Sequence, residues 1–105
     1  MKQYRVLFSQ QAQADLSEIY YYIIDRYNDQ YNAKKLLDAI IDRCNDLEYF
    51  PRISPAKVIS NGYNFRFIHT RRYTIAYYID ENLSRVIIRR ILAPGRNAIE
   101  IISSE

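Results

Sequence analysis

Apolar and polar positions repeat with two different periods along the chain, and the period changes near its midpoint. Residues 3–8 alternate with a period of two and predict a strand, whereas residues 10–27 and 32–49 carry apolar side chains at helical spacing. Ser9 is a suitable N-cap for the first helix, and Pro51 is expected to stop the second. Because only a few residues separate the two helices, we expect them to pack as an antiparallel hairpin.

A period of two returns in the second half of the chain. It predicts four strands, over residues 57–60, 63–69, 72–80 and 85–92. The dipeptide Asn61-Gly62 predicts a tight hairpin between the first two, because both residues tolerate a positive φ. A short helical segment is expected over 97–103. The predicted order β-α-α-β-β-β-β describes an α+β fold, a helical hairpin against a mainly antiparallel sheet, in a single domain over residues 1–105.

Composition limits the class of protein. An apolar fraction of 49% and a charged fraction of 26% are typical of soluble globular proteins. No apolar run approaches the roughly 20 residues that span a bilayer, and the first residues do not resemble a signal peptide, so we expect a cytoplasmic protein without membrane contact. The single Cys44 excludes an internal disulfide and a cysteine-based zinc cluster. Neither a metal nor a cofactor is expected.

The two halves of the chain differ in charge. Residues 1–50 hold six Lys/Arg against eight Asp/Glu, a net charge of −2, whereas residues 51–105 hold nine against four, a net charge of +5. Eleven of the fifteen basic residues are arginines, and planar guanidinium groups suit phosphate and carboxylate better than lysine does. The basic half therefore favours an anion-binding surface, the alternative being arginines that only keep the protein soluble.

Arg66, Arg89 and Arg90 lie in the middle of predicted strands. Alternation places Arg66 on the face opposite Phe65 and Phe67, and it places Arg89 and Arg90 on opposite faces from each other. One member of that pair must lie among apolar side chains, where a charge needs a partner. The sequence leaves two interpretations open: an internal salt bridge to one of the helix carboxylates, or an anion-binding face. The candidate helix carboxylates are Asp15, Glu18 and Asp38.

The only histidine and the strand tyrosines are further candidates. His69 is the last residue of a predicted strand and precedes Arg71 and Arg72; it is either an exposed structural residue or a general base. Tyr77 and Tyr78 point to opposite faces of their strand, so one of them is available for contact.

Several segments together resemble the RelE/ParE superfamily of bacterial toxins from type II toxin–antitoxin modules, and the ParE branch in particular. The segments are FSQQAQADLSEIYYYI at 8–23, LLDAI at 36–40, LEYFPR at 47–52, RFIHTRRYTIAYYID at 66–80 and RILAPGRN at 90–97. The resemblance covers nearly the whole chain, and the family fold has the element order predicted above. It implies a plasmid-stabilisation (addiction) toxin held silent by an antitoxin.

The resemblance leaves the target open between two activities. RelE-like toxins are ribosome-dependent endoribonucleases that cleave messenger RNA by attack of a 2′-OH on the adjacent phosphate, which requires a base, an acid and cations. ParE-like toxins inhibit DNA gyrase and lack that catalytic set. In this chain His69 stands approximately where RelE-like enzymes have a sheet arginine, and Arg96 matches their later basic residue. Residues 99–104 supply no terminal tyrosine or histidine, and only Lys57 and Arg52 stand near the expected lysine pair.

The leading hypothesis is therefore a toxin that inhibits growth by binding gyrase, without being an enzyme. Its expected target- or antitoxin-binding residues are Arg66, Arg71, Arg72, Arg89, Arg90, Arg96 and Tyr78. The alternative is a ribosome-dependent endoribonuclease, with the catalytic residues Arg66, His69, Arg89 and Arg96. A third possibility is an inactive remnant that only binds antitoxin. The expected partners are an acidic, partly disordered antitoxin, in a hetero-oligomer, and either gyrase or the ribosome with its message.

Overall fold

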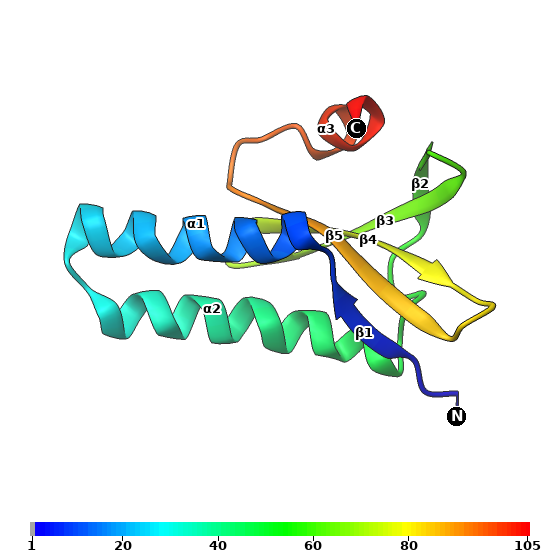
Figure 1. The fold of residues 1–105 in the computed structure, drawn as a ribbon, viewed down its shortest axis with the longest axis horizontal. Helices are drawn as coiled ribbons and strands as arrows, with labels where there is room; N and C mark the ends of the chain where they lie inside the picture. The colour runs from blue at the N-terminus through cyan, green and yellow to red at the C-terminus, as the bar shows by residue number, and fades with distance from the viewer. Residues whose placement is uncertain (1) are drawn as a thin grey trace.

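The computed structural model describes residues 2–105 and has the predicted α+β architecture (Figure 1). A helical hairpin extends to one side of a five-stranded sheet, and a short third helix lies over the sheet (Figure 1). The elements are β1 (Arg5–Phe8), α1 (Gln10–Tyr27), α2 (Gln30–Asn45), the 3₁₀ turn η1 (Asp46–Glu48), β2 (Ala56–Ser60), β3 (Tyr63–Thr70), β4 (Tyr73–Asp80), β5 (Arg85–Leu92) and α3 (Ala98–Ser104). None of the helices within residues 2–105 combines the length and apolar character that crossing a membrane requires.

The first helix has the predicted bounds, and the second ends earlier than predicted. Ser9 caps α1 as expected, because its hydroxyl accepts a hydrogen bond from the backbone N–H of Ala12 at 3.0 Å. Asn28 ends α1 in the left-handed conformation with φ 51°. The regular helix α2 stops at Asn45 and tightens into η1, well before Pro51, which is a common way for a helix to end.

The strand order in the sheet is β1-β5-β4-β3-β2. Neighbours are antiparallel except β1 and β5, which are parallel. The helical hairpin and η1 connect β1 to β2, which lies at the opposite edge of the sheet. The predicted Asn61-Gly62 turn joins β2 and β3, with positive φ at both residues.

The two faces of the sheet carry separate apolar clusters. The larger cluster lies under the α1–α2 hairpin, and its largest fully buried members include Ile40, Leu47, Ile75 and Tyr77. The smaller cluster joins Phe65, Phe67 and Ala76 to Ile102 of α3. Phe65 and Phe67 therefore point away from the hairpin, and Arg66 lies on the opposite face from them, as alternation along β3 predicted.

The parallel strand β1 covers only the first half of β5 and leaves its second half as a free edge. Two side chains from the start of α1 hydrogen-bond to this edge. The Ser9 hydroxyl donates to the carbonyl of Arg89 at 2.9 Å, and the Asp15 carboxylate accepts from the backbone N–H of Ile91 at 2.9 Å. The same carboxylate receives Nε and Nη2 of Arg90 at 2.9 and 3.2 Å. The side chains of Asp15 and Arg90 are only 5% and 13% exposed, so this is a buried pair.

Replacing Asp15 with alanine should lower the free energy of unfolding by about 3–5 kcal/mol, because it leaves a buried guanidinium and a strand N–H without their acceptor. Urea denaturation followed by circular dichroism measures the loss. The control is Asp25→Ala, an exposed carboxylate on the same helix, expected to change stability by about 0.5 kcal/mol or less. A similar small change for both variants would contradict the role assigned to Asp15.

Cys44 should be inert in the folded protein. It is fully buried in the cluster under the hairpin, and desolvation raises the pKa of its thiol to about 12, so on the order of one molecule in ten thousand carries the reactive thiolate at pH 8. A thiol reagent at pH 8 should label the native protein far more slowly than the protein in guanidinium chloride. Equal labelling rates would contradict this burial.

Candidate functional site

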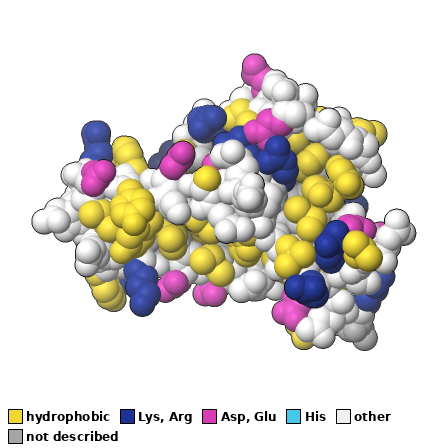
Figure 2. Space-filling model, viewed as in Figure 1, with side chains coloured by type: hydrophobic (Ala, Val, Ile, Leu, Met, Phe, Trp, Pro, Cys, Tyr) yellow, Lys and Arg dark blue, Asp and Glu magenta, His cyan; other side chains and the backbone are white. Residues whose placement is uncertain are grey.

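The candidate site is the sheet face that points away from the helical hairpin, which we call the α3 face. Strand register and the smaller apolar cluster assign its basic and aromatic members, which are Arg5, Tyr63, Phe65, Phe67, His69, Tyr78, Arg85, Arg89 and Arg90. In Figure 2, acidic and basic side chains lie side by side beneath α3, with hydrophobic side chains next to them. The face thus has a part that α3 covers and a part that it leaves open.

A β-bulge places Arg89 and Arg90 on the same side of β5, against the sequence expectation. Ala76 pairs with Arg90 and Tyr77 pairs with Ile88, so Arg89 is an extra residue in the ladder. The bulge resets the alternation: Val86 and Ile88 before it and Ile91 after it all belong to the cluster under the hairpin. Strict alternation was wrong here because one inserted residue reverses the phase of every side chain beyond it.

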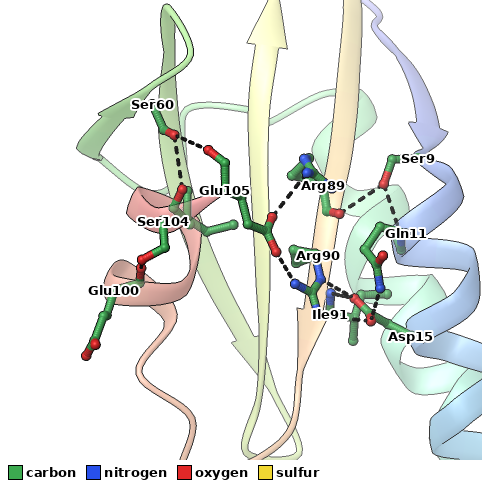
Figure 3. Close-up of polar contacts among 12 residues, drawn as sticks. Ser9, Gln11, Asp15, Ser60, Arg89, Arg90, Ile91, Glu100, Ser104 and Glu105 are labelled. Carbon is green, nitrogen blue, oxygen red and sulfur yellow. Dashed lines mark hydrogen bonds and ion pairs between the residues drawn. The ribbon is translucent and has the colours of Figure 1, made fainter.

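Both of these arginines contact the side chain of Glu105 (Figure 3). Nη2 of Arg89 lies 3.2 Å from Oε1, and Nη1 of Arg90 donates to Oε2. Hydrogen bonding to Asp15 raises the pKa of Arg90, with Glu105 adding to the effect. The internal salt bridge to a helix carboxylate, one of the two interpretations of this pair, is therefore present for Arg90 and Asp15.

Helix α3 is held on this face mainly by Ile102. Seven residues are too few to form a stable helix in isolation, so packing must hold it. Ile102 is 1% exposed, and burying such a side chain contributes about 1.5–3 kcal/mol, more than the 0–1 kcal/mol of a partly exposed ion pair. The Ser60 hydroxyl donates to the carbonyl of Ile102 at 3.0 Å, and the Asn61 amide donates to that of Glu105 at 3.0 Å.

The open part of the α3 face carries two more arginines and an aromatic pair. Arg5 of β1 stands beside Arg85 of β5 in the parallel register, and Arg85 contacts Asp80 at 3.0 Å, which lowers the pKa of that carboxyl. Tyr63 stacks on Tyr78 with ring centroids 4.0 Å apart. Partial burial, and then the neighbouring Tyr63, raises the pKa of Tyr78. Tyr78 is thus the contact-available member of the Tyr77–Tyr78 pair, since Tyr77 is fully buried with its hydroxyl donating to the carbonyl of Pro51.

Two predicted site residues lie away from Arg89 and Arg90. Arg66 is half-buried on the hairpin face, pairs in register with Tyr77, and donates to the carbonyl of Ser54 at 2.6 Å. His69 is exposed on the α3 face of β3, two strands from β5 and so roughly 10 Å across the sheet from it. Its Nδ1 lies 3.1 Å from the Thr74 hydroxyl.

The remaining predicted site residues are exposed and lie in turns and loops. Arg71 and Arg72 form the β3–β4 turn, and Arg96 follows β5. Arg96 lines a groove of about 570 Å³ between α1 and the end of β5, together with Glu18, Tyr22, Tyr73, Arg90 and others. Within residues 2–105 no three or more His, Cys, Asp or Glu side chains gather as a metal site would require.

Three residues that belong to the α3 face or contact its arginines were not predicted from the sequence. Arg5 and Tyr63 carry no signal of their own, because their importance comes from neighbours on other strands. Glu105 carries none either, since its contacts depend on how α3 docks.

Comparison with known proteins identifies the family to which this fold belongs. Residues 6–97 match the protein family described as the ParE toxin of the type II toxin–antitoxin system parDE. The chain belongs to the ParE toxin family. It is therefore a toxin component of a type II toxin–antitoxin system within the RelE/ParE superfamily, as the sequence resemblance predicted.

Solved structures with a similar fold come from both branches of the superfamily. The ParDE system from P. aeruginosa has a chain with TM-score 0.74 and 16% identity, covering 90% of this toxin and 100% of that chain. The RelBE2 toxin–antitoxin complex from Mycobacterium tuberculosis gives 0.68 and 20%, covering 91% and 97%. A mutant of the E. coli toxin RelE in the free state gives 0.67 and 12%, covering 97% and 95%. At these identities the likeness extends to the fold alone. A search of curated protein sequences finds no match.

Replacing Glu105 with glutamine should loosen α3 without unfolding the protein. The change removes the charge that Arg89 and Arg90 share but leaves Ile102 packed, so we expect a stability loss of about 1 kcal/mol or less and faster amide hydrogen exchange in α3. Exchange measured by mass spectrometry reports this directly. The matched control is Glu100→Gln on the same helix, which removes an equal charge whose hydrogen-bond partner among the described residues is Asn97. Equal exchange in both variants would contradict a specific role for Glu105.

Proposed function

We propose that this toxin arrests growth in the cytoplasm by binding DNA gyrase, and that it has no catalytic activity of its own. The observation that carries the proposal is the separation of the groups a ribonuclease would need. Arg66 lies on the hairpin face, His69 lies two strands from Arg89, and Arg90 is engaged by two carboxylates. General acid–base catalysis requires such groups within hydrogen-bond reach of one reacting centre.

The arginines on the α3 face and at its margins suit binding. Arg5 and Arg96 are exposed, and neither contacts a carboxylate within residues 2–105. Arg89 remains one-third exposed beside Glu105, and Tyr78 adds a partly open aromatic surface. Arginine and tyrosine are the residue types that dominate binding energy at protein interfaces. A surface of this kind supports recognition of a large partner.

We further propose that a cognate antitoxin neutralises the toxin. The ParDE and RelBE2 structures of similar fold are toxin–antitoxin systems by their descriptions. An acidic, partly disordered antitoxin would find complementary charge in the basic half of the chain and apolar anchors on the helical hairpin, where exposed tyrosines gather. These are Tyr21, Tyr22, Tyr27 and Tyr31, each at least 56% exposed.

A supercoiling assay with purified gyrase tests the target. The toxin at micromolar concentration should inhibit supercoiling, and the double variant Arg89→Ala/Arg96→Ala should need at least about tenfold more protein, equivalent to about 1.4 kcal/mol of binding. The control removes two exposed charges from α2, as Lys34→Ala/Lys35→Ala, and should inhibit like the unmodified toxin.

Three results would contradict the proposal. The first is no inhibition and no stabilised cleavage complex. The second is cutting of translated messages in primer extension that disappears in His69→Ala/Arg96→Ala, which would support the ribosome-dependent endoribonuclease. The third is normal growth when the toxin is expressed alone, which would support an inactive, antitoxin-binding remnant.

A further inference from the structure

A row of apolar side chains crosses all five strands on the α3 face. Strand register places Leu7 beside Ile87, and Ile87 beside Tyr78. It also places Phe65 beside Val58. The rings of Phe65 and Tyr78 meet edge to face with their centroids 5.3 Å apart, which makes the row continuous. This apolar row therefore runs from the β1 edge of the sheet to the β2 edge.

Helix α3 covers one end of the apolar row and leaves the other end open. Phe65 is buried in the cluster that Ile102 of α3 completes, and Val58 packs against the same cluster. Leu7 and Ile87, by contrast, are half-buried, and they belong to neither of the two apolar clusters described above. Because an apolar sheet face is normally covered by a second layer of structure, the open end of the row lacks part of that layer.

Arginines flank the open end of the row on both sides. Arg5 and Arg85 lie two residues along the strands on one side of it, and Arg89 lies two residues along β5 on the other. The four residues from Arg85 to Arg89 span roughly 13 Å of strand, close to the width of about 10–12 Å of a helix with its side chains. Arg5 belongs to no ion pair within residues 2–105, and the Arg89 side chain is 32% exposed.

The chain itself shows which kind of segment covers this row. Helix α3 buries Ile102 in one cluster with Phe65, and the carboxylate of Glu105 contacts Arg89 and Arg90 beside the row. One helix thus supplies an apolar anchor for the row and an acid for the flanking arginines. The open end toward β1 offers the same two kinds of contact to a helix from outside the chain.

Single-stranded nucleic acid is a poorer match for the open end. Proteins hold single strands with aromatic side chains on which bases stack, whereas the open end has the aliphatic side chains of Leu7 and Ile87 at its centre. Tyr63 and Tyr78 lie next to it, but they stack on each other with ring centroids 4.0 Å apart. Aliphatic side chains between two lines of guanidinium groups suit a protein segment with one apolar stripe and carboxylates beside it.

We propose that the open end of the apolar row binds an acidic amphipathic helix of the toxin's target protein. The apolar stripe of that helix packs on Leu7, Ile87 and Tyr78. Carboxylates on its two flanks pair with Arg5 on one side and with Arg89 on the other. The inference rests on the proposed function, because it takes the target to be a protein that the α3 face recognises.

A synthetic peptide tests the surface in the absence of the target. The probe is a fluorescent peptide of leucine, alanine and glutamate, about 18 residues long, with leucine on one helical stripe and glutamate on both sides of it. A second peptide has the same composition in scrambled order. Fluorescence anisotropy with the full-length toxin should show at least about tenfold tighter binding of the amphipathic peptide, because only that peptide presents an apolar stripe. Equal binding of both peptides would reduce the effect to charge attraction and overturn the site.

Two variants separate the apolar contact from the charged one. Ile87→Thr removes apolar surface but keeps a β-branched side chain in the strand, and Arg5→Ala removes an exposed charge. Each should weaken binding of the amphipathic peptide about threefold or more. The matched controls are Ile59→Thr on the edge strand β2 and Lys34→Ala on α2, both exposed, which should bind like the unmodified toxin. Circular dichroism checks that each variant is folded, and Arg5→Ala alone decides if Ile87→Thr is not.

Three further results would overturn the site. The first is no binding of the amphipathic peptide by the unmodified toxin. The second is binding that the two variants leave unchanged, or that the controls weaken equally. The third is displacement of the peptide by poly(U) at a lower concentration than by unlabelled peptide, which would favour single-stranded RNA on this face.

The outcomes distinguish this surface from the proposed target. Peptide binding that depends on Ile87 and Arg5, without inhibition of supercoiling, would support the surface and contradict gyrase as the target. Inhibition of supercoiling that both variants retain in full, together with no peptide binding, would do the reverse.

Discussion

The carboxylate of Asp15 completes the hydrogen bonding of a strand that has lost its neighbour. β1 leaves the sheet at Phe8, and the chain turns at once into α1, so the second half of β5 has no strand on that side. A buried N–H without an acceptor costs about 1–3 kcal/mol. Asp15 accepts this N–H from Ile91 and binds the guanidinium of Arg90 as well, while Ser9 satisfies the carbonyl of Arg89. Ser9 and Asp15 therefore make the hydrogen bonds that a neighbouring strand would otherwise make, and they attach the helical hairpin to the sheet.

The bulge at Arg89 extends this link to the opposite face. With one residue inserted, Arg90 reaches Asp15 at the edge and Glu105 under α3, and Arg89 turns to the same carboxylate (Figure 3). A buried arginine between two acids is satisfied by the fold. It is therefore a poor candidate for a group that must bind a second molecule. Glu105 therefore links two features of the α3 face. One is the packing of α3 on Phe65, Phe67 and Ala76, and the other is the arrangement of Arg89 and Arg90.

Local patterns in the sequence predict the helices, strands and turns well, but they predict the contacts between these elements only in part. Helical spacing gives α1 its observed bounds, and Asn61-Gly62 gives the β2–β3 turn, because both depend on residues close in the chain. Alternation gives the correct face for Arg66. It fails for Arg89 and Arg90, because the bulge arises from pairing with β4 and leaves no local mark. The contacts of Glu105 depend on α3, whose position is set by residues far earlier in the chain, such as Phe65 and Ala76. The family resemblance predicts the fold. Neither the local patterns nor the resemblance distinguishes arginines that stabilise the fold from arginines that are free to bind a partner.

That separation follows from what each guanidinium already contacts. Arg90 is held by Asp15 and Glu105, and Arg66 by the carbonyl of Ser54, so their charge stabilises the toxin. Arg71, Arg72 and Arg96 lie in exposed turns and loops, where arginine adds nothing to packing. At the β3–β4 turn it even works against the backbone, since the neighbouring hairpin makes the same turn with Asn-Gly and no strain. An exposed arginine in a strained turn that belongs to no ion pair within residues 2–105 is available to a partner outside the chain. The net charge of residues 51–105 therefore overstates the surface that is available for binding. That surface consists of a few exposed arginines around those that groups of the protein already engage.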